Sequence, residues 1–172
     1  AERIYYIVVG TFLTCLVSEF PLVTPDGAQY SLRNLPAIML GVFGGPVLGV
    51  ASGFLGGLYR LWLGGPTAFQ GFCGVFLSGL CAGGMSRMTT KGELGTFPIW
   101  RATIPSFIST PPIVLVIYAT LPAEMFSSML GMLLLLNLVF QPAAVLVLTY
   151  LLQDNIKTYQ RQVELIDRAR RD

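Results

Sequence analysis

The chain has 172 residues, of which 53% are apolar and only 12% are charged, and its mean hydropathy is +0.67. This composition excludes an ordinary soluble domain. The net charge of +2, the absence of histidine and the lack of a CxxC pair among the three cysteines argue against nucleic-acid binding, His-dependent catalysis and a zinc site. We expect no cofactor and no metal.

Long apolar stretches without a charged side chain divide the chain. Each is close to the roughly 20 residues that a helix needs to cross the hydrocarbon core of a bilayer. The stretches are Ile4–Ser18, Asn34–Tyr59, Leu61–Ser86, Ala102–Ala123 and Met125–Gln153. The sequence therefore predicts an all-α integral membrane protein.

The first helix is expected at about Ile4–Phe20, followed by a loop at Pro21–Ser31 that carries the turn signal Pro25-Asp26-Gly27. No small-residue cleavage pattern follows Phe20. We therefore interpret this segment as a retained helix and not as a signal peptide.

The segment Leu35–Leu63 is long enough for one tilted helix of about 40 Å, but Gly44-Gly45-Pro46 interrupts it. A single helix would put Arg33 and Arg60 on opposite sides of the membrane, whereas a turn would return both to the same side. Glycines at every fourth position from Gly41 to Gly57 form a ridge for close helix packing and mildly favour one helix. Gly-Gly-Pro at mid-depth favours a break, so the residues alone leave both possibilities open.

Three further helices are expected at Thr67–Gly84, Phe97–Leu121 and Met125–Leu152. Proline disturbs a helix because it lacks the backbone N–H and its ring meets the preceding turn. We therefore predict kinks in the last two helices, at Pro105, Pro111, Pro112 and Pro142.

The composition changes abruptly after Leu152 to a charged tail. Apolar residues at 3-4-3 spacing in this tail predict a short parallel coiled-coil seam that continues the last membrane helix; they are Ile156, Tyr159, Val163 and Ile166. We therefore divide the chain into a transmembrane domain at residues 1–153 and a parallel dimeric coiled-coil linker at residues 154–172. This linker is expected to lead to a further part of the protein.

An arginine, a Gly-Gly-Pro element, a second arginine and another Gly-Gly pair follow one another in SLRNLPAIMLGVFGGPVLGVASGFLGGLYRLWLGGPTAFQGFCGVFLSGLCAGG. This string resembles the LytS/YehU-type membrane sensors, a five-transmembrane receptor family, over roughly Asp26–Gly84. LPAIMLGVFGGPVLG also resembles the S components of energy-coupling-factor transporters, in which a Gly-Pro turn separates two short helices.

These resemblances imply a bundle of six helices, with five as the alternative, and a Gly-rich broken pair. The residues that would shape its turns and packing are Gly44, Gly45, Pro46, Gly64 and Gly65. Both termini would be cytoplasmic, the membrane would be the bacterial inner membrane, and Arg33 and Arg60 would lie near its outer face.

The output domain is implied by resemblance as well, because this family carries either a histidine kinase or a GGDEF diguanylate cyclase. The last residues, Arg168-Ala169-Arg170-Arg171-Asp172, resemble the linker into the Asp-x-Leu-Thr opening of GGDEF domains. We therefore expect a diguanylate cyclase, which makes c-di-GMP. The chain itself shows no paired carboxylates, nucleophile-base set or metal cluster and is not expected to be an enzyme.

Arg33 and Arg60 flank charge-free sequence, where an ionisable side chain usually pairs or binds something. Interfacial snorkelling of both is the alternative. Because a guanidinium group matches a carboxylate in bidentate geometry, we expect a small organic acid such as pyruvate, which some members of the family sense. Gln70 and Cys73 in the next helix would contact the rest of the ligand.

Other polar and aromatic residues have two interpretations each. Tyr59 is a further candidate for the ligand site, and Tyr30 and Trp62 could also line it, although all three suit the interfacial aromatic belt better. Asn137 and Gln141 suit hydrogen bonds between helices. Glu19 and Asp26 would be counter-charges of the two arginines or solvated loop residues.

We therefore expect a membrane sensor domain. Its expected partners are a small carboxylate-bearing metabolite, the lipid bilayer and a second copy of the chain, and nucleic acid is not among them. The alternative is the substrate-binding S component of a vitamin or solute transporter, against which the charged heptad tail argues.

Overall fold

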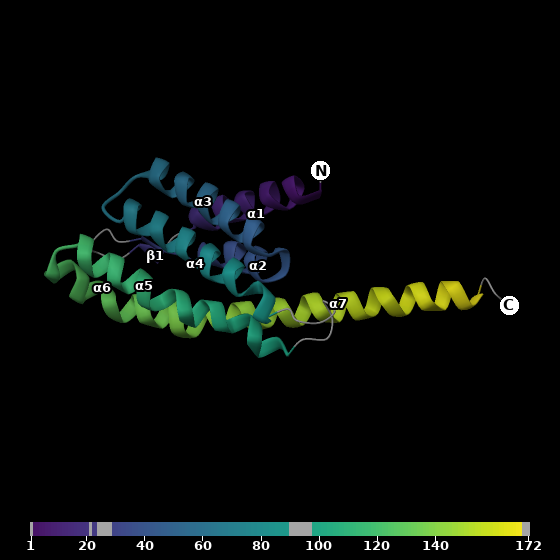
Figure 1. Ribbon diagram of the computed structural model, residues 1–172. Helices are drawn as coiled ribbons and strands as arrows, with labels where there is room; N and C mark the ends of the chain where they lie inside the picture. The colour runs from purple at the N-terminus through teal and green to yellow at the C-terminus, as the bar shows by residue number, and fades with distance from the viewer. Residues whose placement is uncertain (1, 21, 24–28, 90–97, 170–172) are drawn as a thin grey trace.

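The protein folds almost entirely as helix (Figure 1). The computed structural model describes residues 2–20, 22–23, 29–89 and 98–169. In chain order the elements are α1 (Glu2–Ser18), β1 (Leu22–Val23), β2 (Gln29–Tyr30), α2 (Asn34–Gly44), α3 (Pro46–Leu63), α4 (Ala68–Thr89), the 3-10 helix η1 (Ile99–Thr103), α5 (Ile104–Thr120), α6 (Ala123–Leu135), the π-helix η2 (Leu136–Phe140) and α7 (Gln141–Ala169). The two short strands pair antiparallel.

The predicted all-α membrane class is confirmed, because the described residues form six continuous helical segments. In this count η1 and α5 form one segment, and α6, η2 and α7 form another. Three of these segments are long and apolar enough to cross a membrane: Ala68–Ser86, Ile99–Thr120 and Ala123–Ile166. The outer surface carries large exposed apolar side chains such as Leu115 and Val147. Such a surface suits contact with lipid tails.

The reversal between α2 and α3 occurs at Gly45, which has a φ of +86°. This backbone conformation favours glycine because a Cβ would clash there. Pro46 then occupies the first turn of α3, where its missing N–H is not needed. The broken arrangement of the Leu35–Leu63 segment is therefore correct, and α2 enters the bundle while α3 returns to the same end.

The glycine ridge packs against α4, although Gly45 within it forms the turn. A methyl group on Gly49 would lie 2.6 Å from the carbonyl oxygen of Gly79 and 2.7 Å from the Cα of Gly41. A methyl group on Gly53 would lie 3.0 Å from the carbonyl oxygen of Val75. Because lipid provides little hydrophobic drive for helix association, this close backbone contact is a main source of packing energy.

Proline changes the helix type at two points. Pro105 lies in the first turn of α5, directly after the 3-10 turns of η1, and Pro142 follows the π-turns of η2. The missing N–H of Pro142 leaves a preceding carbonyl without its usual helical partner, and the π-turns accommodate this. Pro111 and Pro112 remain inside one continuous α5.

Two apolar clusters lie in the core of the described part of the chain. One lies between α5, α6 and η2 and contains Ile113, Ile117, Met129, Leu133 and Leu136. The other lies between α2, α4, η1 and α7 and contains Ile38, Val42, Ala82, Ala102 and Val145.

The last helix extends far beyond the other helices, as Figure 1 shows. On this extension Tyr159, Val163 and Ile166 are exposed by 68%, 40% and 55%. Pairing of these residues in a coiled coil remains a prediction. Arg170, Arg171 and Asp172, on which the resemblance to a GGDEF linker partly depends, lie outside the described residues.

Candidate functional site

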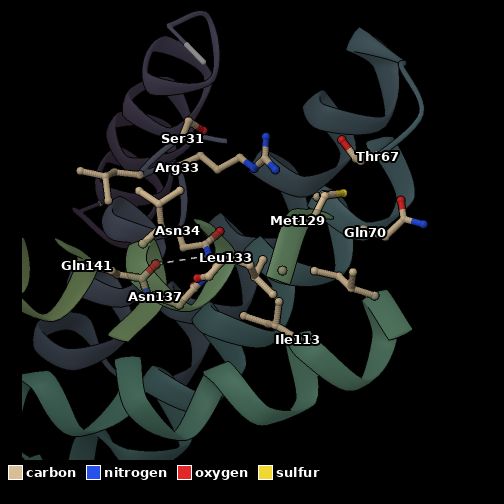
Figure 2. A pocket seen from close by; sticks show the side chains of 15 residues that line it. Ser31, Arg33, Asn34, Thr67, Gln70, Ile113, Met129, Leu133, Asn137 and Gln141 are labelled. Carbon is tan, nitrogen blue, oxygen red and sulfur yellow. Dashed lines mark hydrogen bonds between the residues drawn. The ribbon is translucent and has the colours of Figure 1, made fainter. Parts of the chain in front are cut away.

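A small cavity of about 50 Å³ lies at the end of the bundle where α2 begins and α3 ends. Figure 2 shows Arg33 and Asn34 entering it from the start of α2, and Asn137 and Gln141 from the last long helix. Gln70 lines it from α4, and apolar residues of the α5–α6 cluster close it below. The cavity is therefore formed by segments that lie far apart in the sequence.

Arg60 is almost completely buried, with 1% of its surface exposed. One guanidinium nitrogen donates to the carbonyl oxygen of Gly64 at 2.6 Å, and another donates to Thr67 Oγ1 at 3.4 Å. Gly64 and Gly65 have φ values of +73° and +94°, so the chain turns back over the end of α3 and brings this carbonyl to the arginine. Arg60 Nε has no partner in the described part of the chain.

Arg33 and Arg60 meet at Gly71 on α4. A methyl group on Gly71 would lie 3.0 Å from Arg33 Nη2, 3.1 Å from Arg60 Nε and 2.7 Å from Arg60 Cγ. The positive charges of Arg33 and Arg60 are close enough to repel each other. No carboxylate of the described residues compensates this repulsion. Two positive charges for which the described residues supply no carboxylate attract an anion in a low-dielectric region.

Amide side chains supply the other polar groups of the cavity. Asn34 Nδ2 donates to Gln141 Oε1 at 3.4 Å, and this contact joins the start of α2 to the start of α7. Gln70 Nε2 donates to Thr120 Oγ1 at 2.9 Å, and Asn137 Nδ2 donates to the carbonyl oxygen of Leu133 at 2.9 Å. The remaining amide atoms of Gln70, Asn137 and Gln141 are buried without a partner among the described residues.

The structure brings only some of the sequence candidates together. Arg33 and Gln70 line the cavity, and Arg60 lies beside it at Gly71 without being part of the lining. Cys73 is not among the lining residues. Tyr59 is also outside the lining: its hydroxyl donates to Glu19 and its ring lies 5.6 Å from that of Trp62. Asp26 lies outside the described residues, and so does the side chain of Tyr30.

Sequence reasoning missed the part that Asn34, Asn137 and Gln141 play in the cavity. The two residues in the last helix were interpreted as contacts between helices, and Gln141 does make such a contact with Asn34. The available signal was an amide side chain within charge-free apolar sequence. Burying such an amide is costly unless it forms a hydrogen bond with another residue or with a ligand.

The profile of the family described as "5TMR of 5TMR-LYT" matches residues 1–155 of the chain. The chain belongs to this family. Curated relatives include the proteins named "Sensor histidine kinase BtsS" of Escherichia coli (strain K12) and of Shigella flexneri, each 35% identical over 78 residues. The aligned part covers 45% of this chain and 14% of each relative, so the chain spans only a small part of their length.

The match confirms the predicted resemblance to LytS-type sensors. The protein is a transmembrane sensor domain of a family that occurs in histidine kinases. Its role is therefore in signal transduction.

Proposed function

We propose that this domain binds a small carboxylate-bearing metabolite, of the size and charge of pyruvate, between Arg33 and Arg60. The observation that carries the proposal is the meeting of two guanidinium groups at Gly71, beside a cavity whose described lining contains no acidic residue. Two arginines can hold a carboxylate through several charge-assisted hydrogen bonds. Gln70 and the amides of Asn34, Asn137 and Gln141 contact the rest of the ligand.

The ligand enters from the outer side of the bacterial inner membrane, and the C-terminus is cytoplasmic. The basic residues of the tail support this orientation, since positive residues accumulate on the cytoplasmic side. In a Cys-free background, Leu63→Cys is expected to react with an impermeant thiol reagent applied to intact cells, and Asp154→Cys is expected to stay unlabelled. The opposite labelling would refute the orientation.

Ligand binding controls a cytoplasmic output domain through the last helix. Asn137 and Gln141 line the cavity, and the helix that carries them continues to Ala169. A ligand that prefers one arrangement of this helix shifts the population toward it, by no more than its difference in affinity for the two arrangements. The seam of Ile156, Tyr159, Val163 and Ile166 passes the change to a dimer of output domains.

A diguanylate cyclase is the output domain that the tail resemblance favours, whereas the named relatives favour a histidine kinase. The long continuation of α7 supports a sensor over a transporter S component, because an S component needs no helix beyond the membrane. The coding sequence after residue 172 distinguishes the two output domains directly.

The binding proposal is tested by calorimetry of the purified domain with pyruvate. Arg33→Ala and Arg60→Ala should each raise the Kd by about tenfold or more, since a hydrogen bond to a charged group contributes roughly 1.5–3 kcal/mol. Arg101→Ala is the matched control, because Arg101 contacts the ring of Trp100 and is not part of the cavity lining. Unchanged affinity in both the Arg33 and the Arg60 variant would remove the proposal.

A further inference from the structure

The cavity contains two buried oxygen atoms for which the described part of the chain supplies no hydrogen-bond donor. They are Gln70 Oε1 and Asn137 Oδ1, and no partner for either is found within the described residues. Gln70 and Asn137 are exposed by only 8% and 6%. Both side chains line the same cavity as Arg33, as Figure 2 shows.

The neighbouring hydrogen bonds fix which amide atom is the oxygen. Asn137 Nδ2 lies 2.9 Å from the carbonyl oxygen of Leu133, which can only accept. Gln70 Nε2 lies 2.9 Å from Thr120 Oγ1, and this hydroxyl already donates its proton to the carbonyl oxygen of Val116 at 2.7 Å. The unpaired atoms of Gln70 and Asn137 are therefore acceptors and not donors.

A buried acceptor without a donor is unfavourable, and a ligand that supplies the donor removes this cost. We infer that the ligand carries, besides its carboxylate, a hydroxyl group that donates to Asn137 Oδ1 or Gln70 Oε1. This inference rests on the proposed carboxylate site and narrows its ligand class to short hydroxy acids.

A keto acid fits these acceptors less well. A keto oxygen only accepts hydrogen bonds, so it could pair with Gln141 Nε2, the unpaired donor of the described lining, but would leave both amide oxygens unpaired. A hydroxyl group can accept from such a donor and also donate to an amide oxygen. An amino acid supplies donors but also a positive charge, which is unfavourable beside two guanidinium groups in a cavity without a described acidic residue. The cavity volume of about 50 Å³ holds roughly four water-sized groups. Lactate and pyruvate have more non-hydrogen atoms than this, so the carboxylate would have to lie at the arginines beside Gly71, and longer acids fit less well still.

The inference is tested with four acids of one carbon skeleton, which differ only at the second carbon. These are lactate in both enantiomers, pyruvate, alanine and propionate, each titrated by calorimetry into the purified domain in lipid nanodiscs. One enantiomer of lactate is expected to bind about tenfold or more tightly than pyruvate, alanine and propionate. Equal or tighter binding of pyruvate or alanine overturns the inference.

Asn137→Leu provides the second measurement, since leucine has nearly the shape of asparagine without the acceptor. This variant should lose most of the preference for lactate over propionate. Asn155→Leu is a matched control: Asn155 makes the same type of bond, to the carbonyl oxygen of Leu151 at 2.8 Å, but is exposed on α7. It should keep the full preference.

Gln70→Met removes the other acceptor with little change in length, and serves if Asn137→Leu fails to fold. Retention of the full lactate preference in every folded cavity variant overturns the inference. Binding of the acids without a preference for lactate refutes the hydroxyl group alone and leaves the carboxylate site intact. Absence of binding by all four acids overturns both proposals.

Discussion

Replacing Gly71 by alanine adds one methyl group at the point where the two arginines meet. The new carbon would lie 2.7 Å from Arg60 Cγ and 3.0 Å from Arg33 Nη2, both closer than normal contact distance. One or both guanidinium groups must therefore move, and a ligand held between them loses part of its charge-assisted bonding.

The expected effect on affinity follows from the loss of one such bond. A hydrogen bond to a charged group contributes roughly 1.5–3 kcal/mol, which corresponds to a rise in the Kd for the bound acid of about tenfold to a hundredfold. The fold should lose some stability as well, because the nearest displaced atom, Arg60 Cγ, lies close to the backbone on a buried side chain. The gain of roughly 0.8–1 kcal/mol of alanine over glycine within a helix offsets part of this loss.

The assay is calorimetry with the best-binding three-carbon acid, together with thermal unfolding of the same sample. Gly74→Ala is the matched control, since it lies one turn further along α4 and lines the same cavity. Its new methyl group would meet Asn34 Oδ1 at 3.9 Å and Ile113 Cγ2 at 4.0 Å, which are ordinary contacts. Wild-type affinity in Gly71→Ala, or an equal loss in Gly74→Ala, would refute the reasoning.

Two further predictions concern packing and assembly. Gly79→Ala places a methyl group against the backbone carbonyl of Gly49 and should destabilise the bundle by about 1–3 kcal/mol in detergent unfolding. The control Gly84→Ala meets no atom within 4 Å and should not destabilise the bundle. Equal losses of stability in the two variants would contradict the contact of the glycine ridge with α4. In a Cys-free background, oxidation should form a disulfide between two copies of Val163→Cys, because a seam position faces its equivalent in a parallel dimer. Arg161→Cys, on the opposite side of the helix, should form this disulfide poorly. Similar disulfide formation in both variants would contradict the seam.

Much of the fold could be predicted because its signals are local. A run of apolar residues without charges identifies a membrane helix wherever it occurs, and Gly44-Gly45-Pro46 contains the residues that a tight reversal requires. The remaining ambiguity was whether this signal breaks the helix. The glycine ridge did not decide it, because a ridge packs against α4 in the same way on either side of the turn.

The site was predicted less completely than the fold. Arg33 and Arg60 were recognisable from their charge in apolar surroundings, and the reversal brings them to one end of the bundle. Tyr59 was a candidate from its sequence neighbourhood alone, yet on α3 it points to Glu19 and Trp62 and not into the cavity. Which way a side chain faces depends on the neighbours of its helix, and sequence spacing does not give these neighbours.

The sequence by itself determined that the chain lies in a membrane, where its helical segments run and that two arginine cations stand in apolar sequence, because each follows from residue type over a short stretch. Only the tertiary structure decided what surrounds those cations. Asn34 and Gln141 are 107 positions apart and still share a hydrogen bond. The unpaired acceptors of Gln70 and Asn137 indicate a ligand only because the fold places both in the lining of one cavity. Contacts across such separations depend on how whole helices pack, and no local pattern encodes them.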